Sequence, residues 1–484
     1  MTLIFGKIFD QRRIFSFILL IFLFFYSIYS FKLPSAYIFN TDIARDSNDI
    51  IGIAQGKLSL VGPKLNFGGL YAGPYYYYLF VPILFMSNFQ FVSILIFNSS
   101  IFALALIYFF LKVKNNFSFL WAILCTCLIG LLPLYVSSSR NPGNGFTYIP
   151  FLLFFLTYIY FNNIQNRKEL FYLGLLAGII VNFHPLNLVV FLSTSVLIFA
   201  FLKKRSLFIV FALGFLITYL PFIIFELRHD FVGIRRTIFD LKNLTLVRSV
   251  SDDPLKSSLI SNYVRYSKDI VTFLILNPIY YAFLLPLPLI LKKHFDMKNL
   301  YFTFASIASF LIYLIISHGY VSSHYVFPVS IFLFFAITTF VASYNLKFIA
   351  LILIVLEIVN FNFDMYSAST KPYFKFESVV NSVLDNHLID KGTPFNIIAV
   401  SDPKVLVPSG NEYRFFFRKN GYNPNSVNEY NKSKVLLVFV EIDNFNISSL
   451  QNWETGQFGP NYLDNWKELD YSDVKIYKIS KETI

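Results

Sequence analysis

The chain has 484 residues, of which 56% are hydrophobic and 14% charged, and its mean hydropathy is positive at +0.58. These values exclude an ordinary soluble protein and indicate an integral membrane protein. The formal net charge is +12, but many Lys and Arg residues fall in short loops between apolar runs. We therefore attribute the charge to the orientation of the helices in the membrane and not to a nucleic-acid partner. The two cysteines, Cys125 and Cys127, lie inside an apolar run, which excludes a disulfide framework and disfavours a CxC metal site.

The N-terminal segment predicts a first membrane helix that starts in the cytoplasm. Lys7, Arg12 and Arg13 precede an apolar run from Ile14 to Phe31. That run is long for a signal peptide and lacks a small-residue cleavage site, so we expect an uncleaved helix leading outward. The expected location is the plasma membrane, crossed many times.

The segment from Asn40 to Tyr78 is where we expect the chemistry. It is polar, charged and glycine-rich in a chain that is otherwise apolar, and it carries Asp42, Asp46 and Asp49. Irregular, charged backbone at a membrane face is costly unless it lines a cavity or a site. We therefore interpret the first outer loop, 32–74, as the candidate catalytic loop.

The later spans follow from the positions of the basic loops. Leu70 to Met86 is predicted to be interfacial or half-inserted, because a full crossing would place Lys112 and Lys114 on the wrong side. Further spans are expected over 91–111, 117–136, 146–161, 170–183, 186–202, 206–225, 270–291, 300–317, 326–344 and 348–361. The pattern predicts an all-α polytopic membrane domain over 1–363 with about 11–13 transmembrane helices.

The composition becomes soluble in character over 364–484. Ser378 to Asp390 has helical spacing, Asn396 to Val400 and Val435 to Glu441 are typical of short buried strands, and Val474 to Ile479 alternates like an edge strand. We expect a small extracytoplasmic α/β domain. Because it has no phosphate-loop, metal-ligand or nucleophile-elbow pattern, its expected role is structural or substrate-positioning.

The predicted topology gathers polar side chains at the outer face. An acid near several cations beside a membrane suits attack on a sugar whose leaving group is a lipid-linked phosphate. A carboxylate then takes the proton of the acceptor hydroxyl, and cations neutralise the departing phosphate. Candidate catalytic residues are Asp42 and Asp46; candidates for substrate or phosphate binding are Arg45, Lys64, Tyr75, Arg140, His184, Arg228, His229 and His324.

Each candidate also has a structural interpretation. Thr41 and Asp42 suit the cap of a helix from Ile43 to Gln55, with Asp46 in its first turn. Two carboxylates four residues apart repel each other on one helical face unless a cation or a function is present. The basic candidates suit snorkelling or lipid headgroup contact, and a lone histidine is more often a satisfied interfacial residue. No cofactor is predicted: no HxxxH or HxH pair indicates zinc, and nothing supports a divalent metal.

Five motifs in order carry a family resemblance. They are DIARD at 42–46, GPYYYYL at 73–79, SRNP at 139–142, FELRHDF at 225–231 and HYVFP at 324–328. Together they resemble bacterial membrane glycosyltransferases of the GT-C superfamily, similar to the protein mannosyltransferases and the aminoarabinose transferase of lipid A. The resemblance spans roughly residues 1–360 and is strongest in the first 150.

The resemblance implies a fold, a donor and a base. Relatives use a polyprenyl-phosphate sugar donor, act at the outer face and invert the anomeric centre, and Asp42 matches their first acid. Ile43 stands where relatives have a second acid, so Asp46 is the remaining candidate for that role. The basic residue that relatives carry before the motif at 73–79 is missing, which leaves Lys64 or Arg140 as substitutes. The implied partners are the donor, membrane lipids and an acceptor glycan, lipid or protein, with no nucleic acid.

Two other functions compete with this one. A flippase or transporter predicts two matching halves with broken spans and charges at mid-membrane, whereas this chain shows mid-span prolines but few such charges and no halves. A polysaccharide polymerase or ligase would place arginines in a central loop. Arg235, Arg236, Arg248 and Arg265 fit that pattern, while the acidic first loop speaks against it.

Overall fold

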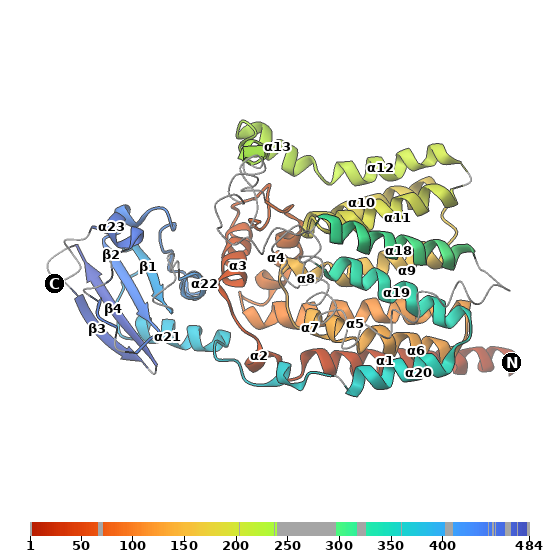
Figure 1. Cartoon of the computed structure of the whole chain (residues 1–484). Coiled ribbons are helices and arrows are strands. Elements are labelled where there is room, and N and C mark those ends of the chain that lie inside the picture. Colours follow the sequence, from red (N-terminus) through yellow and green to blue (C-terminus); the bar gives the residue numbers. More distant parts are fainter. Residues whose placement is uncertain are drawn as a thin grey trace, which may run out of the picture. The chain divides into compact units, whose positions relative to one another are not determined.

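The computed structural model has many helices and one small C-terminal sheet (Figure 1). It describes residues 2–65, 71–202, 204–236, 238–239, 297–316, 326–359, 361–401, 410–443, 445–447, 450, 452–459, 466–471 and 473–481. The predicted fold class, a helical membrane protein with a C-terminal α/β part, is confirmed.

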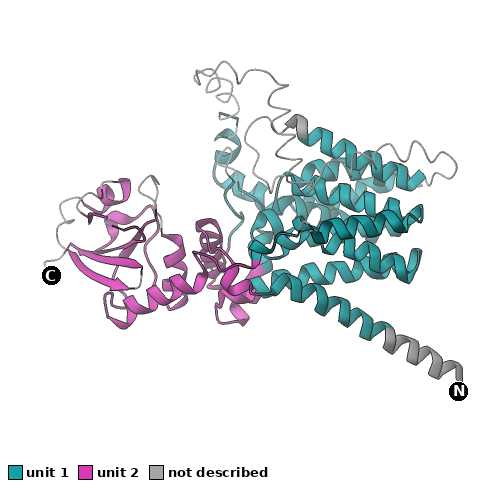
Figure 2. Ribbon diagram, turned by 60° about the horizontal axis from the view of Figure 1, so that its bottom comes forward, with its two compact units in different colours: residues 1–31, 59–79, 94–365 teal, residues 32–58, 80–93, 366–484 magenta. Residues whose placement is uncertain are grey.

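The chain divides into two compact units (Figure 2). Unit 1 comprises residues 1–31, 59–79 and 94–365, and unit 2 comprises 32–58, 80–93 and 366–484. The predicted boundary at 363/364 lies close to the last division, but 32–58 and 80–93 group with the C-terminal part. Apolar burial explains this grouping, because the ring of Phe39 lies within 6 Å of Phe91, Phe376, Phe415 and Phe416.

Unit 1 is a set of helices that run side by side (Figure 1). Its helices are α1 (Thr2–Ser30), α5 (Phe91–Asn116, from residue 94), α6 (Phe119–Gly130), α7 (Pro133–Ser139), α8 (Asn144–Thr147), α9 (Ile149–Phe161), α10 (Arg167–Phe183), α11 (Asn187–Phe201), η1 (Arg205–Leu207), α12 (Phe208–Ile217), α13 (Leu220–Arg228), α18 (Met297–Ile316), α19 (Phe327–Ser343), α20 (Lys347–Val359) and η4 (Phe363–Tyr366). Helices α10 and α12 approach backbone to backbone, since a Cβ on Gly174 would lie 2.1 Å from the Phe211 carbonyl oxygen. Small residues allow such close packing in membranes.

Several helices of the described residues are long and apolar enough to cross a bilayer. Three qualify singly, Ile14–Ala36, Phe91–Asn116 and Asn144–Phe161, and two bent pairs raise the number to five. The pairs are α6 with α7, bent by 68°, and η1–α12 with α13, bent by 49°. By length and composition this is a multi-pass membrane protein. The count of about 11–13 stays a prediction: several expected spans are helices of 10–17 residues, and 270–291 lies outside the described residues.

Helix α4 (Tyr75–Met86) has only 12 residues and contains Pro82. A crossing needs about 20 residues, so the helix is too short to span alone. That length suits the interfacial or half-inserted element predicted for 70–86.

Unit 2 contains a four-stranded sheet with flanking helices. Its elements are α2 (Leu33–Ala36), α3 (Thr41–Ala54), the later part of α4, α21 (Tyr373–Asp385), β1 (Phe395–Val400), α22 (Asn411–Lys419), η5 (Tyr430–Lys432), β2 (Val435–Val440), α23 (Trp453–Phe458), β3 (Trp466–Tyr471) and β4 (Val474–Ser480). The strand order is β1-β2-β4-β3. Strands β1 and β2 pair in parallel, with Phe395 opposite Val435, and the other pairs are antiparallel.

The predicted strands 396–400, 435–441 and 474–479 correspond to β1, β2 and β4. Every residue of β1 and β2 is buried, which explains why both show as continuous apolar runs. The predicted helix 378–390 is α21, which begins five residues earlier. Strand β3 was not predicted, because its exposed, polar sequence WKELDY lacks an apolar pattern.

Candidate active site

The acidic residues that follow the first apolar helix, Asp42, Asp46 and Asp49, lie on α3 (Thr41–Ala54). The Asn40 side chain accepts a hydrogen bond from the Ile43 backbone N–H at 3.0 Å and is the N-cap of this helix. The expectation that Thr41 and Asp42 form the cap is therefore wrong by one to two residues. With Asn40 as the cap, the Asp42 carboxylate is left to pair with another side chain.

Asp42, Arg45 and Asp46 form one ion-paired cluster, which we call the acidic turn. Arg45 Nη1 lies 2.9 Å from Asp42 Oδ1, and Arg45 Nη2 lies 2.9 Å from Asp46 Oδ1. Arg45 Nε donates to the same Asp46 oxygen at 3.0 Å. The cation thus offsets the repulsion that two carboxylates four residues apart would have.

The two carboxylates of the acidic turn differ in exposure. The Asp42 side chain is 75% exposed, whereas that of Asp46 is 3% exposed. Burial raises the pKa of Asp46 to about 7, against the opposing effect of the Arg45 charge and hydrogen bond. Asp42 is therefore the accessible carboxylate of the acidic turn, and Asp46 is the buried one; both are ion-paired with Arg45.

In unit 1 the segment GPYYYYL links motifs that are distant in sequence. The Gly73 N–H donates to the Asn182 carbonyl at 2.8 Å, the Tyr75 hydroxyl to the Thr218 carbonyl at 2.9 Å, and the Tyr76 hydroxyl to the Pro142 carbonyl at 2.7 Å. A Cβ at position 73 would lie 2.2 Å from Asn182 Oδ1, so glycine is required there. The motifs at 73–79 and 139–142 thus meet.

Lys64 and the motif at 225–231 also belong to this part of unit 1. Lys64 pairs with Tyr71 in an isolated antiparallel bridge. The Tyr71 ring lies 5.7 Å from the Phe225 ring, which stacks on His229 at 4.3 Å. Arg228, the last residue of α13, is exposed. The Lys64 backbone and the His229 ring are therefore connected through Tyr71 and Phe225.

Arg140 has a different environment. Its side chain is buried and donates to the backbone carbonyls of Tyr29, Phe31 and Met365 at 2.9–3.1 Å. These bonds tie the end of α1 to the chain after α20. A phosphate would have to displace them, so the geometry favours a structural role for Arg140.

His184 is the C-cap of α10 and is 5% exposed. Its ring stacks on Tyr148 with centroids 6.0 Å apart, and Asn144 Nδ2 donates to the neighbouring Phe183 carbonyl. The structure therefore shows His184 packed against Tyr148, and its role in substrate binding stays a prediction. His324, with His318 and Arg265, lies outside the described residues.

Sequence reasoning missed the residues that hold α3 in place. Glu412 and Arg418, both on α22, contact α3 through Thr41 and Asn48. No local signal could have identified them, since the contacts join positions about 370 residues apart. Among the residues that the structure describes, no three His, Cys, Asp or Glu side chains are placed to hold a metal ion.

Comparison with known proteins gives fold neighbours only. No family model and no curated protein matches the chain. The solved structures that resemble it include ArnT from Cupriavidus metallidurans, in the apo state (9% identity, 97% of this chain and 98% of that one, TM-score 0.46) and bound to undecaprenyl phosphate (8%, 96% and 96%, 0.44). They also include the mycobacterial arabinofuranosyltransferase AftD (9%, 98% and 40%, 0.49) and the Archaeoglobus fulgidus oligosaccharyltransferase (12%, 86% and 67%, 0.42).

These neighbours are membrane glycosyltransferases of the GT-C fold, the superfamily that the five sequence motifs resemble. Their identities lie between 8% and 12% and their TM-scores between 0.42 and 0.49. At these values the likeness assigns no donor, acceptor or catalytic residue to this chain.

Proposed function

We propose that this chain is a glycosyltransferase that moves a sugar from a polyprenyl-phosphate donor to a hydroxyl of an extracytoplasmic acceptor. The acidic turn supports this proposal most directly. It presents an exposed carboxylate, Asp42, held at 2.9 Å by Arg45, in the polar segment that follows the first apolar helix. A proton acceptor in that segment suits a donor whose lipid tail stays in the bilayer.

In the proposed reaction Asp42 is the general base. It takes the proton of the acceptor hydroxyl as that oxygen attacks the anomeric carbon from the side opposite the phosphate. The bond between the anomeric carbon and the phosphate oxygen breaks, and polyprenyl phosphate leaves with both electrons of that bond. The anomeric centre is inverted. General-base help of this kind is worth about two to four orders of magnitude in rate.

Three basic side chains of unit 1, Lys64, Arg228 and His229, are the proposed phosphate ligands. The Lys64 backbone pairs with that of Tyr71, whose ring lies 5.7 Å from Phe225, and the Phe225 ring stacks on His229. Arg228, next to His229 in the chain, is exposed. Basic side chains that contact the donor phosphate would neutralise the charge that develops on it as it leaves. Arg140 is omitted from this role because its guanidinium already donates to three carbonyls.

The test is sugar transfer by the purified protein in lipid nanodiscs. Radiolabelled polyprenyl-phosphate sugars and extracted membrane acceptors are supplied, and wild type is compared with Asp42→Asn. Asp473→Asn is the matched control, since Asp473 is also an exposed aspartate of unit 2 paired with a basic side chain, Lys375. We expect transfer by wild type and the control and its loss in Asp42→Asn.

Three results would contradict the proposal in different ways. Equal transfer by wild type and Asp42→Asn would remove Asp42 from the base role. With the protein in sealed vesicles, labelled lipid that moves across the bilayer without formation of a glycosidic bond would favour a flippase. A product extended by many sugars or by a whole preformed glycan would favour a polymerase or ligase.

A further inference from the structure

Helix α3 packs against α22 within unit 2. Asn48 Nδ2 donates to the Asn411 carbonyl at 3.1 Å, and Arg418 Nη1 donates to the Asn48 carbonyl at 3.3 Å. At the other end of the contact the Thr41 hydroxyl donates to Glu412 Oε1. Three polar contacts along the two helices therefore restrict how α3 turns about its axis.

The two faces of α3 have different partners. Ala44, Asn48 and Ile51 are buried and follow one another at helical spacing. Asp42 and Arg45 lie on the adjacent, more exposed face. Because the helix is rigid, a rotation permitted at the Asn48 face would redirect the Asp42 carboxylate by the same angle.

The chain that enters α3 is fixed by an apolar contact. Phe39 is fully buried, and its ring lies 5.8 Å from that of Phe415 and 5.7 Å from that of Phe416, both on α22. Its backbone N–H donates to the Lys371 carbonyl at 2.9 Å. The position of α3 along α22 is therefore set one turn before the acidic turn begins.

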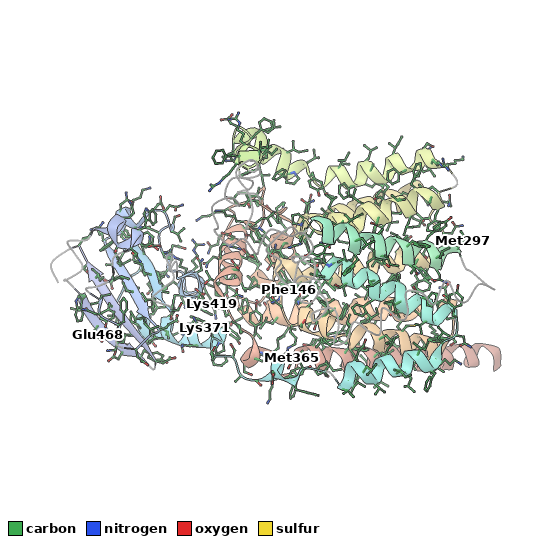
Figure 3. The ribbon with its side chains drawn as sticks, in the orientation of Figure 1. Phe146, Met297, Met365, Lys371, Lys419 and Glu468 are labelled. Atoms are coloured by element: carbon green, nitrogen blue, oxygen red, sulfur yellow. The ribbon has the colours of Figure 1, made fainter. Side chains whose placement is uncertain are left out.

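Helix α22 is itself held by its neighbours. Lys419, at its C-terminal end, forms an ion pair with Glu377 of α21 and donates to Gln90 Oε1 at 3.1 Å. Lys371 and Lys419 are both labelled in Figure 3, which shows the side chains of this region. Helix α22, which contacts α3, is thus tied to α21 and to the side chain of Gln90.

The charged groups at this contact are substantially desolvated. Burial raises the pKa of Glu412 and lowers that of Arg418, while the Asp49 charge opposes the change at Arg418. Burying a charged group costs its hydration, and interactions with its partner offset part of that cost. Removing one partner therefore leaves the other group buried without this offset. The contact is therefore sensitive to single substitutions on either helix.

We propose that α22 positions the acidic turn, with Glu412 acting through Thr41 and Arg418 acting through Asn48. Both are positioning residues, because they act on Asp42 through α3 and not on the substrate. This inference rests on the proposed function and extends it: the C-terminal domain aligns the base for the sugar-transfer step. Misplacement of a reacting group by about 1 Å can cost roughly a hundredfold in rate.

The experiment combines steady-state transfer with hydrogen exchange of the α3 amides, both on the full chain in nanodiscs. The variants are Arg418→Ala, Arg418→Lys and Glu412→Gln, and Glu429→Gln is the control at an exposed ion pair of the same unit. We expect kcat to fall roughly ten- to a hundredfold in Arg418→Ala, with an unchanged KM for the donor and faster exchange over 43–54. Arg418→Lys should recover part of kcat, and the control should resemble wild type.

A milder variant guards against loss of folding. Thr41→Val removes only the hydroxyl that donates to Glu412, at an exposed position, and should lower kcat and speed α3 exchange to a smaller degree. Wild-type exchange and wild-type kcat in Arg418→Ala and Thr41→Val would overturn the proposal. A wild-type protein that transfers no sugar would instead overturn the proposed function, and the exchange data would still decide whether α22 holds α3.

Discussion

Asp42 and Arg140 are both charged residues that follow an apolar run, yet the structure treats them in opposite ways. The Asp42 carboxylate is 75% exposed and pairs with one side chain. The Arg140 guanidinium is buried and donates to the carbonyls of Tyr29, Phe31 and Met365. A charged residue at the end of an apolar run therefore needs a partner, whatever its role. Its burial and the kind of partner it has distinguish a residue available for reaction from one that holds the fold together.

The largest expected effect is on the rate of sugar transfer when Asp42, the exposed residue of the two, is replaced. Asp42→Asn should lower the rate of sugar transfer by about two to four orders of magnitude. Its melting temperature should stay close to that of wild type, because an exposed ion pair contributes little to stability. Transfer assays and thermal unfolding of the same preparations measure both. A large drop in melting temperature would make Asp42 architectural and remove the contrast with Arg140.

Asp46 gives the next largest effect, and it depends on pH. Burial raises its pKa from the ordinary 3.8 to about 7, so between these values the folded chain holds a proton that the unfolded chain has lost. The contribution of Asp46 to stability is then greatest at and below about pH 4 and falls as pH rises to about 7, by up to about 4 kcal/mol.

Asp46→Asn should remove that dependence, because the amide resembles the protonated acid. Melting temperatures between pH 4 and 8 are the measurement. The variant should match wild type near pH 4 and exceed it at pH 8. A wild-type protein that becomes more stable as pH rises through this window would show that the Arg45 ion pair outweighs the burial of Asp46.

Arg140→Ala should have the opposite effect to Asp42→Asn, lowering stability more than activity. It removes the guanidinium donor from one buried and two part-buried hydrogen bonds to carbonyls, which should lower the free energy of unfolding by roughly 3 kcal/mol. Transfer per folded molecule should change much less than in Asp42→Asn, as judged by activity normalised to folded protein. If kcat instead collapses while the melting temperature is kept, Arg140 contacts the substrate and the phosphate-binding prediction from the sequence gains support.

Local patterns in the sequence predicted most of the fold. The central strands Phe395–Val400 and Val435–Val440 are buried on both faces and therefore show as unbroken apolar runs. A helix from Ile43 to Gln55 was predicted, and α3 spans Thr41–Ala54 with Asn40 as its cap. Strand Trp466–Tyr471 could not be found, because an exposed edge strand carries no apolar alternation.

The candidate site was less predictable, because its determining contacts are distant in sequence. The acids were found from their place after the first apolar run. Their environment depends on Phe39 meeting Phe415 and on Arg418 meeting Asn48, and no periodicity records such contacts. That Arg140 binds backbone carbonyls could not be predicted either, because every residue has a backbone carbonyl and the sequence does not mark which of them accept a hydrogen bond.

The smallest expected effect belongs to Asp473, whose side chain is 65% exposed and ion-paired with Lys375. It resembles Asp42 in exposure, charge and pairing and lies in the same unit, but not in the acidic turn. Asp473→Asn should change stability by less than about 1 kcal/mol and leave transfer at the wild-type rate in the same assay. Loss of transfer here would mean that any exposed ion pair of unit 2 affects activity, so a defect in Asp42→Asn would no longer identify a base.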